Sequence, residues 1–384
     1  ISTIRSKMEI YVMKKRFVLV MALILLVASA SVFADVKITG SFRAGYKFVW
    51  NNDNKLAVTA VKRATGAESR TYMNVADKDG IWSINFSGAL VLNNSDIINL
   101  SPATLTGTRS AATISLDKAL KTANVDLKDV TVDLSIGNTT HTAALWAYSD
   151  PLGNEYYLEN TGVYSTALTV GYAKMVKVRF GFDPSVGVAA ASDKEFRMVL
   201  SALITPVDGV SVAGGFANRA YDEQKSTDYK TGLDASVNAD IAKLAQLDKD
   251  VKVGASAHLR YYAKDTSDND VKLTFLDGAL TGGYKTISGY VEYRGSFDGV
   301  NSDNNKNGMQ VKATYSGIKN ASLYASYDLN NFKSTDHVSK ITVGATYTLA
   351  GIKFCGEPYF QLTKASGADD VKAFGITTYA QIGF

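Results

Sequence analysis

The stretch FGITTYAQIGF, residues 374–384, decides the fold of this chain. Every second side chain is apolar or nearly so, and the side chains between them are small or polar. Successive side chains of a β-strand point to opposite faces, so the stretch predicts a strand with one apolar face. The apolar set, which includes Ala380 and Ile382, continues to Phe384. This favours a strand of a membrane barrel over an edge strand of a soluble sandwich.

A second long run begins at Val36. Val36, Ile38 and Phe42 belong to an apolar set that continues to Phe48, and the alternate positions carry three bases and several small residues. The run is 13 residues long. Tilted membrane strands need about 9–11 residues, whereas soluble strands usually have about 5–6. The bases on its polar face predict a wet interior and a lipid-facing exterior.

Similar runs recur to the end of the chain and are separated by tight turns such as 77–80, 206–209, 317–320 and 350–351. We expect strands to begin near residues 36, 67, 81, 129, 142, 163, 175, 194, 210, 229, 250, 271, 285, 307, 321, 338, 352 and 372. The tight turns then fall at one end of the barrel and the longer polar segments at the other. The sequence therefore predicts an all-β fold: a transmembrane antiparallel β-barrel of 16–18 strands.

The first 34 residues predict a cleaved signal peptide. A basic segment at residues 13–16 precedes an almost wholly apolar run at 17–27, and Val32-Phe33-Ala34 offers a cleavage site after Ala34. Met13 looks like the start of the protein, and residues 1–12 like an upstream extension. The alternative is a membrane anchor, although the apolar run is short for one. We expect a single barrel domain over residues 35–384.

Composition excludes several other classes of protein. The first 34 residues carry five of the 41 Lys and Arg residues and one of the 37 acidic residues, which leaves 36 of each. A balanced mature chain gives no case for nucleic-acid binding. The single cysteine, Cys355, excludes an intrachain disulfide and a Cys-rich metal site, and its strand position favours a buried thiol over an intermolecular link.

Catalytic and metal-binding motifs are lacking. His141, His258 and His337 have no metal-binding spacing, and neither G-x-S-x-G nor a P-loop occurs. The segment that begins at Asp303 matches only the first half of a calcium loop, because Thr314 stands where the bidentate Glu belongs. We expect no enzyme activity, no cofactor and no metal.

The segment 93–128 does not keep the alternation of its neighbours. It contains Ser101-Pro102 and a helical piece near residues 116–123. Loops longer than about 12–15 residues are usually functional or disordered. This segment and the one that follows it carry four acidic residues that are candidates for a constriction: Asp96, Asp117, Asp126 and Asp129.

With these features the mature chain resembles the general bacterial porins, and its last residues, Ala380, Ile382 and Phe384, resemble the C-terminal signal that the barrel-assembly machinery reads. The resemblance implies a homotrimer in outer-membrane lipid and one long loop that folds into the lumen. Segment 93–128 is the candidate for that loop, although an outward-folded loop is the alternative. It follows the third expected strand, whereas the family's loop follows the fifth.

The polar face of the expected strands is rich in bases. We expect eleven of them to line the pore: Lys37, Arg43, Lys47, Arg70, Lys177, Arg179, Arg197, Lys252, Arg260, Lys312 and Lys353. Charges that line a pore set its ion preference, so the sequence predicts a modest anion preference. The alternative is that loop acids neutralise these bases.

The function predicted from the sequence is passive diffusion of small hydrophilic solutes and ions through a water-filled lumen. Barrels of about 16–18 strands leave such a channel, whereas eight-stranded barrels are filled by side chains. The alternatives are an outer-membrane barrel that acts mainly as an adhesin or antigen through its loops, and a soluble secreted β-protein.

Overall fold

The fold was analysed in a computed structural model of the chain. The residues that the structure describes are 36–50, 56–60, 69–91, 104–137, 144–151, 165–183, 197–218, 220–222, 227–265, 270–300, 305–332, 334, 336–364, 367 and 369–383. The predicted signal peptide and Phe384 lie outside these residues and remain predictions.

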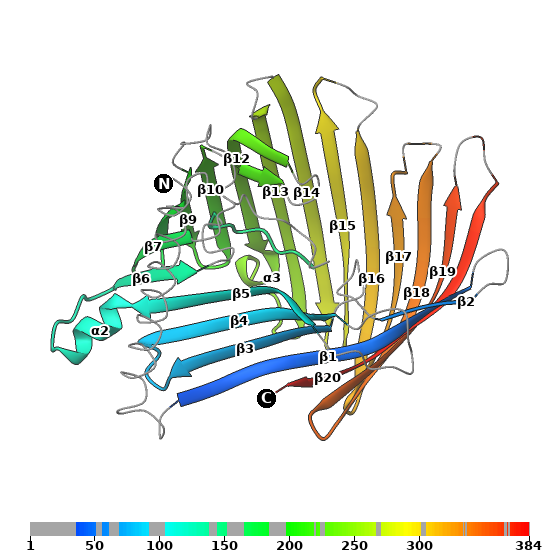
Figure 1. The fold of residues 1–384 in the computed structure, drawn as a ribbon, viewed down its shortest axis with the longest axis horizontal. Coiled ribbons are helices and arrows are strands. Elements are labelled where there is room, and N and C mark those ends of the chain that lie inside the picture. The colour runs from blue at the N-terminus through cyan, green and yellow to red at the C-terminus, as the bar shows by residue number, and fades with distance from the viewer. Residues whose placement is uncertain are drawn as a thin grey trace, which may run out of the picture.

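Antiparallel strands make up almost all of the described chain (Figure 1). The first ten are β1 (Val36–Trp50), β2 (Leu56–Ala60), β3 (Ser69–Asp77), β4 (Trp82–Val91), β5 (Thr104–Ser115), β6 (Val130–Gly137), β7 (Ser165–Tyr172), β8 (Val176–Asp183), β9 (Arg197–Val207) and β10 (Val210–Ala217). The rest are β11 (Ala220–Asp222), β12 (Thr227–Asp240), β13 (Val251–Asp265), β14 (Asp270–Tyr284), β15 (Ile287–Asp298), β16 (Lys306–Ile318), β17 (Ala321–Asn330), β18 (His337–Leu349), β19 (Ile352–Lys364) and β20 (Val371–Gly383).

These strands form one closed barrel with eighteen strand positions. β2 and β3 pair with different parts of the same edge of β1, and β10 and β11 pair likewise with β12, so each pair shares one position. β20 pairs with β1 from Ser41–Gly383 to Trp50–Phe374 and closes the ring. Closure satisfies the backbone groups of both end strands, which a lipid environment requires. The all-β barrel prediction is confirmed, with eighteen strands.

Burial is the reverse of that in a soluble protein. On β13 and β14, His258 and Asp277 face inward and are buried, whereas Leu259, Leu276 and Leu280 face outward. Leu280 keeps 62% of its surface exposed and His258 keeps 1%. A barrel with an apolar exterior and a polar interior belongs in a bilayer.

The two ends of the barrel differ. Tight turns join β3 to β4, β7 to β8, β9 to β10, β14 to β15, β16 to β17 and β18 to β19, and all of them lie at one end, called here the short-turn end. Helices α2 (Leu116–Thr122) and α3 (Ile241–Leu244) also lie at this end. Neither helix is long and apolar enough to span a membrane, nor is any other within the described residues.

The eighteen strands fall within the predicted range of 16–18, but two of the expected strand positions were wrong. The prediction of one long loop over 93–128 fails for residues 104–122, which form β5 and α2, although the helical piece was confirmed. The strand expected near residue 142 does not form in the described residues 144–151, which pair with no strand. The two errors cancel, because one strand was missed and one was added.

Candidate functional site

Residues 144–151, called here the inner segment, run inside the barrel against the wall formed by β9 to β15. Figure 1 shows this segment as a narrow blue-green coil in front of those strands. It belongs to the connection between β6 and β7, and β6 occupies the fifth strand position of the barrel. This is the strand after which the resemblance places the loop that narrows the pore.

Serine side chains hold the backbone of the inner segment. The Leu145 N–H donates to Ser201 Oγ at 2.8 Å, and the Ala147 N–H donates to Ser236 Oγ at 2.8 Å. Ser256 Oγ donates to the carbonyl of Ser149 at 3.1 Å. An extended segment presents like groups every two residues, so three serines on β9, β12 and β13 engage residues 145, 147 and 149 in turn. These bonds satisfy backbone groups that have no strand partner.

The start of the inner segment fills a notch in the wall. Ala144 is buried in an apolar cluster with Val199, Ala217, Tyr262, Leu273 and Phe275. Beside this cluster stands Gly215, where an added Cβ would come within 2.8 Å of Ala144 Cβ and would also overlap the Asp234 carboxylate. Only a glycine leaves room for the segment at this point. This side of the lumen is therefore packed rather than open.

Charged groups fasten the end of the inner segment. Glu292 on β15 is 1% exposed, and its Oε1 accepts from the Tyr148 hydroxyl at 3.0 Å and from Arg294 at 2.7 and 2.9 Å. Arg294 also pairs with Asp150 at 2.7 Å. We call these four residues the Glu292 clasp. Charge-assisted bonds of this kind are among the strongest in proteins.

Burial and the neighbouring Glu292 carboxylate raise the pKa of the Tyr148 hydroxyl, which therefore stays protonated and able to donate. Trp146 and Tyr148 also pack on the His258 ring, with ring centroids 5.5 and 5.9 Å apart. The His258 Nε2 lies 3.8 Å from Asp234 Oδ2 beneath them. The inner segment is thus fixed by backbone bonds, ring contacts and charge pairs.

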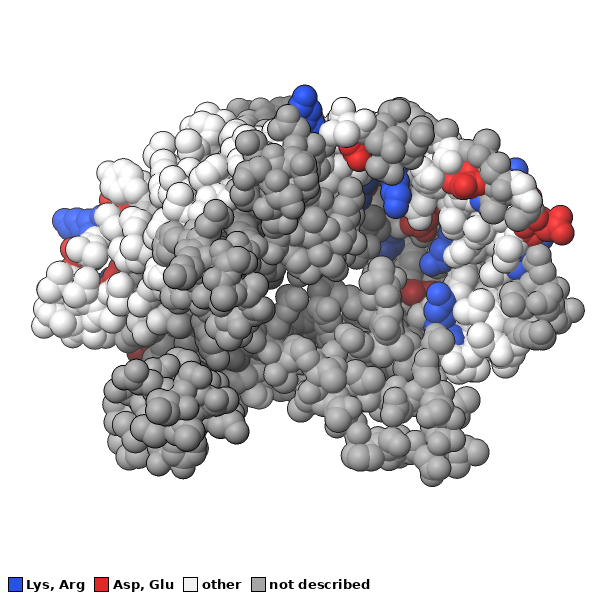
Figure 2. Space-filling model, turned by 45° about the horizontal axis from the view of Figure 1, so that its top comes forward, with Lys and Arg blue, Asp and Glu red and all other residues white. Residues whose placement is uncertain are grey.

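The wall from β16 to β1 carries partly exposed polar groups. Figure 2 shows basic and acidic side chains together on the inner wall beside the central hollow. We use the name open wall for three lysines of this wall and the two tyrosines that their ammonium groups contact: Lys47, Lys312, Lys340, Tyr324 and Tyr359. Lys312 Nζ lies 4.2 Å from the centroid of the Tyr324 ring, and Lys340 Nζ lies 4.6 Å from that of Tyr359. The Glu357 carboxylate accepts from Tyr324 and Cys355 and forms no ion pair with these lysines among the described residues.

The predicted basic lining divides into groups. Lys47 and Lys312 lie on the open wall. Four other lysines lie at inward-facing strand positions nearer the short-turn end: Lys37, Lys177, Lys252 and Lys353. Arg179 Nε donates to Thr169 Oγ1 at 3.0 Å. Arg260 is 3% exposed and lies over the Phe275 ring at 4.7 Å, so it is part of the packed side and does not face the channel. The side chains of Arg43, Arg70 and Arg197 lie outside what the structure describes.

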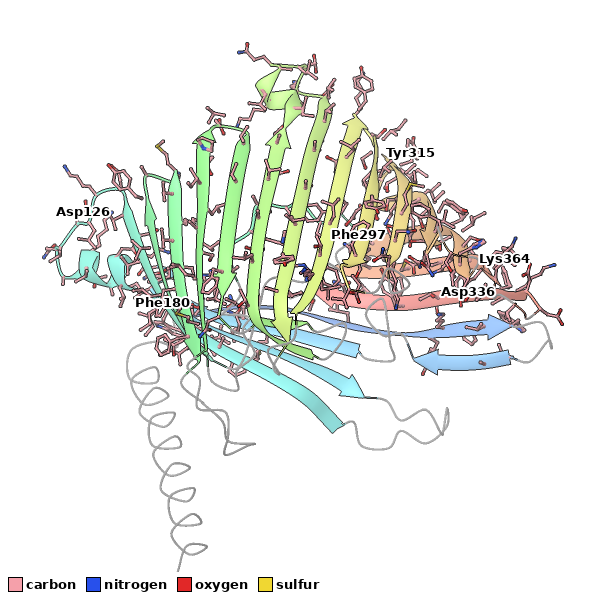
Figure 3. All side chains as sticks on the ribbon, turned by 90° about the horizontal axis from the view of Figure 1, so that it is seen from above. Asp126, Phe180, Phe297, Tyr315, Asp336 and Lys364 are labelled. Atoms are coloured by element: carbon pink, nitrogen blue, oxygen red, sulfur yellow. The ribbon has the colours of Figure 1, made fainter. Side chains whose placement is uncertain are left out.

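The three constriction candidates that the structure describes make no contact with the inner segment. Asp117 lies in the first turn of α2 and accepts from the Val132 N–H at 3.0 Å, and Asp129 precedes β6 at the short-turn end. Figure 3 shows Asp126 at the far edge of the molecule beside α2. Asp96 lies outside the described residues. Sequence reasoning missed Tyr148 and Asp150, which lie in or next to a stretch interpreted as a strand, and it also missed Arg294 on β15.

Cys355 was expected to be a buried thiol, and this is confirmed. It is free, 7% exposed, and its Sγ lies 3.3 Å from Glu357 Oε1. Among the residues that the structure describes, no group of three or more His, Cys, Asp or Glu side chains could hold a metal ion.

No protein-family model matches the sequence, and a search of curated proteins finds no match. Solved structures are similar in fold. OpdL of Pseudomonas aeruginosa has a TM-score of 0.57 at 8% identity, over 92% of this chain and 99% of that chain. OccAB2 of Acinetobacter baumannii has a TM-score of 0.56 at 8% identity, over 93% and 100%. The outer membrane protein OprD of P. aeruginosa has a TM-score of 0.53 at 10% identity, over 90% and 94%.

At these identities the likeness is one of fold. Together with the closed ring and the apolar exterior, it shows that the chain is a transmembrane β-barrel with the fold of these outer-membrane proteins.

Proposed function

We propose that this barrel is a passive channel, a porin, for small hydrophilic solutes and ions. The observation that carries the proposal is the inner segment, which is fastened to one side of an eighteen-stranded barrel and leaves partly exposed polar groups on the other. A barrel of this size is too wide for its own side chains to fill. A fixed segment narrows it to a constriction without closing it.

Liposome swelling tests this proposal. Liposomes that contain the folded protein should swell in small sugars, at rates that fall steeply with solute size. Protein-free liposomes are the control. No swelling and no conductance in planar bilayers would overturn the channel and favour the adhesin or antigen alternative.

We further propose that the channel has a modest preference for anions over cations. Lys47, Lys312 and Lys340 make no ion pair with an acid among the described residues, and the acids beside them are bonded to neutral groups. A net positive wall attracts anions and raises their local concentration. The potential at zero current in a KCl gradient should have the sign of chloride permeation. A clear potassium preference would contradict it.

The homotrimer and the recognition of Ala380, Ile382 and Phe384 by the assembly machinery remain proposals that rest on the resemblance. Mass measurement of the protein in detergent tests the first. Deletion of Phe384, with folded yield as the readout, tests the second.

A further inference from the structure

We propose that Lys47 and Lys340 form a binding site for a compact dianion, of the phosphate or phosphate-ester class, on the open wall. The inference rests on the proposed channel function and names a class of solute that its lumen would hold.

The two lysines converge on one aromatic ring. Lys340 Nζ lies 4.6 Å from the centroid of the Tyr359 ring, and Lys47 Nζ lies 5.2 Å from the same centroid. They come from β18 and β1, and Tyr359 lies on β19 between them. Two ammonium groups held near one ring repel each other, and a doubly charged anion between them would remove that repulsion.

Nearby acids do not form ion pairs with these two lysines. Asp328 stands directly opposite Lys340 in the β17–β18 register, but its carboxylate accepts from Gln310 on the other side. Glu357 accepts from Tyr324 and Cys355. Neither lysine has an ion pair with an acid among the described residues. The two ammonium groups are therefore not ion-paired, and their hydrogen-bond donors are free to bind an anion from the lumen.

The ring between the lysines is fixed in place. Tyr359 is only 4% exposed and stands opposite Gly375 on β20, where an added Cβ would overlap the ring. The ring thus lies against the barrel wall across the glycine, and cation–π attraction holds both ammonium groups over it.

The chemistry of the donors selects the class of anion. Lysine is a compact point charge with three rotatable donors, which suits a tetrahedral phosphate, whereas a planar carboxylate is better matched by the fork of an arginine. Among the described residues, the cations over this ring are both lysines. Two positive charges also favour a dianion over chloride.

Lys312 supplies a matched control on the same wall. It lies 4.2 Å from the Tyr324 ring, which is a lysine–tyrosine contact of the same kind, but only one lysine contacts that ring. Lys312→Gln removes one positive charge from the lumen and leaves the pair at Tyr359 intact.

The experiment measures inorganic phosphate in two ways, at about pH 8, where phosphate is mainly a dianion. Phosphate should reduce the single-channel chloride current of the wild-type protein in a saturable manner. Isothermal titration of the folded protein in detergent should show the same saturable binding. Lys47→Gln and Lys340→Gln should each weaken both effects about tenfold, as expected for the loss of one charge-assisted contact. Lys312→Gln should lower the chloride preference but leave the half-saturating phosphate concentration unchanged.

Two results would overturn the site. One is a wild-type channel that conducts chloride normally but neither is blocked by phosphate nor binds it. The other is an equal shift for all three lysine variants, which would mean a general wall potential without a site. If the wild type conducts nothing, the channel proposal fails, while titration in detergent still decides whether phosphate binds. Heat-modifiable migration on gels should verify that each variant is folded.

Discussion

A single buried carboxylate, Glu292, links the inner segment to the barrel wall. A carboxylate that is buried this deeply requires hydrogen-bond partners, and Glu292 has two. Tyr148 is part of the inner segment, and Arg294 also pairs with Asp150 of that segment. Removal of one member of a buried charge pair leaves the other without compensation and costs about 3–5 kcal/mol. The position of the segment is therefore sensitive to this one residue.

Glu292→Ala should release the end of the inner segment. Without the carboxylate, Tyr148 loses its acceptor and Arg294 loses one of its two acidic partners. We expect higher single-channel conductance, noisier open-channel current and a larger size limit in liposome swelling. Glu357→Ala is the matched control, because Glu357 also accepts from a tyrosine, Tyr324, but does not bond the inner segment among the described residues. Equal conductance in the wild type and Glu292→Ala would contradict this role.

Gly215→Ala should displace the other end of the segment. The added Cβ would overlap the Asp234 carboxylate and come within 2.8 Å of Ala144 Cβ, so one of these groups must move. Gly214→Ala is the neighbouring control: its Cβ would face lipid and meet nothing closer than the Asp234 carbonyl at 3.6 Å. We expect Gly215→Ala alone to raise conductance and to lower the midpoint of thermal unfolding. Equal conductance and equal unfolding midpoints for Gly215→Ala and Gly214→Ala would show that the space at Gly215 does not fix the segment.

At the scale of elements, three serines on β9, β12 and β13 together hold the backbone of the inner segment. Replacement of Ser201, Ser236 and Ser256 by alanine leaves three backbone groups of the segment without their partners. Each lost bond should cost about 1 kcal/mol. The triple variant should therefore be cleaved within residues 144–151 by a protease that spares the wild type, while the barrel stays folded. Ser322→Ala is the control, because Ser322 is a wall serine whose side chain bonds Thr346 and not the inner segment among the described residues. If the triple variant resisted the protease as well as the wild type does, the three serines would not be what holds the segment.

The same elements explain how far the sequence could predict the structure. Long runs such as Val36–Phe48 were predicted because lipid selects large apolar side chains at every second position. β5 was missed because Ala112 and Ser110 stand on the face that it shares with Ile84 and Phe86 of β4, so its alternation is weak. The run Ala144–Tyr148 was interpreted as a strand because its apolar side chains suit the barrel interior as well as they suit a lipid face.

The site was harder to predict than the fold for the same reason. Lys47 and Lys312 were found on the lumen face from the strand period alone. Arg260 follows the same strand period, but it is buried against the Phe275 ring, which packs in the cluster that contains Ala144 of the inner segment. It therefore does not face the channel. Which lumen residues face water depends on where a non-strand segment lies, and no local pattern of residues encodes that.

At the scale of the whole molecule, everything depends on the seam between β1 and β20, because an open sheet leaves a row of backbone groups unpaired in lipid. Gly45 lies in this seam opposite Tyr379, and a Cβ there would overlap the backbone of Thr378. Gly45→Val should prevent the last strand from pairing over the middle of β1. We expect loss of the form that migrates compactly on gels before heating, together with loss of conductance. Gly356→Ala on β19, where a Cβ would meet nothing within 4 Å, should behave like the wild type. A Gly45→Val protein that still gave a heat-modifiable, conducting barrel would mean that the ring does not close through this contact.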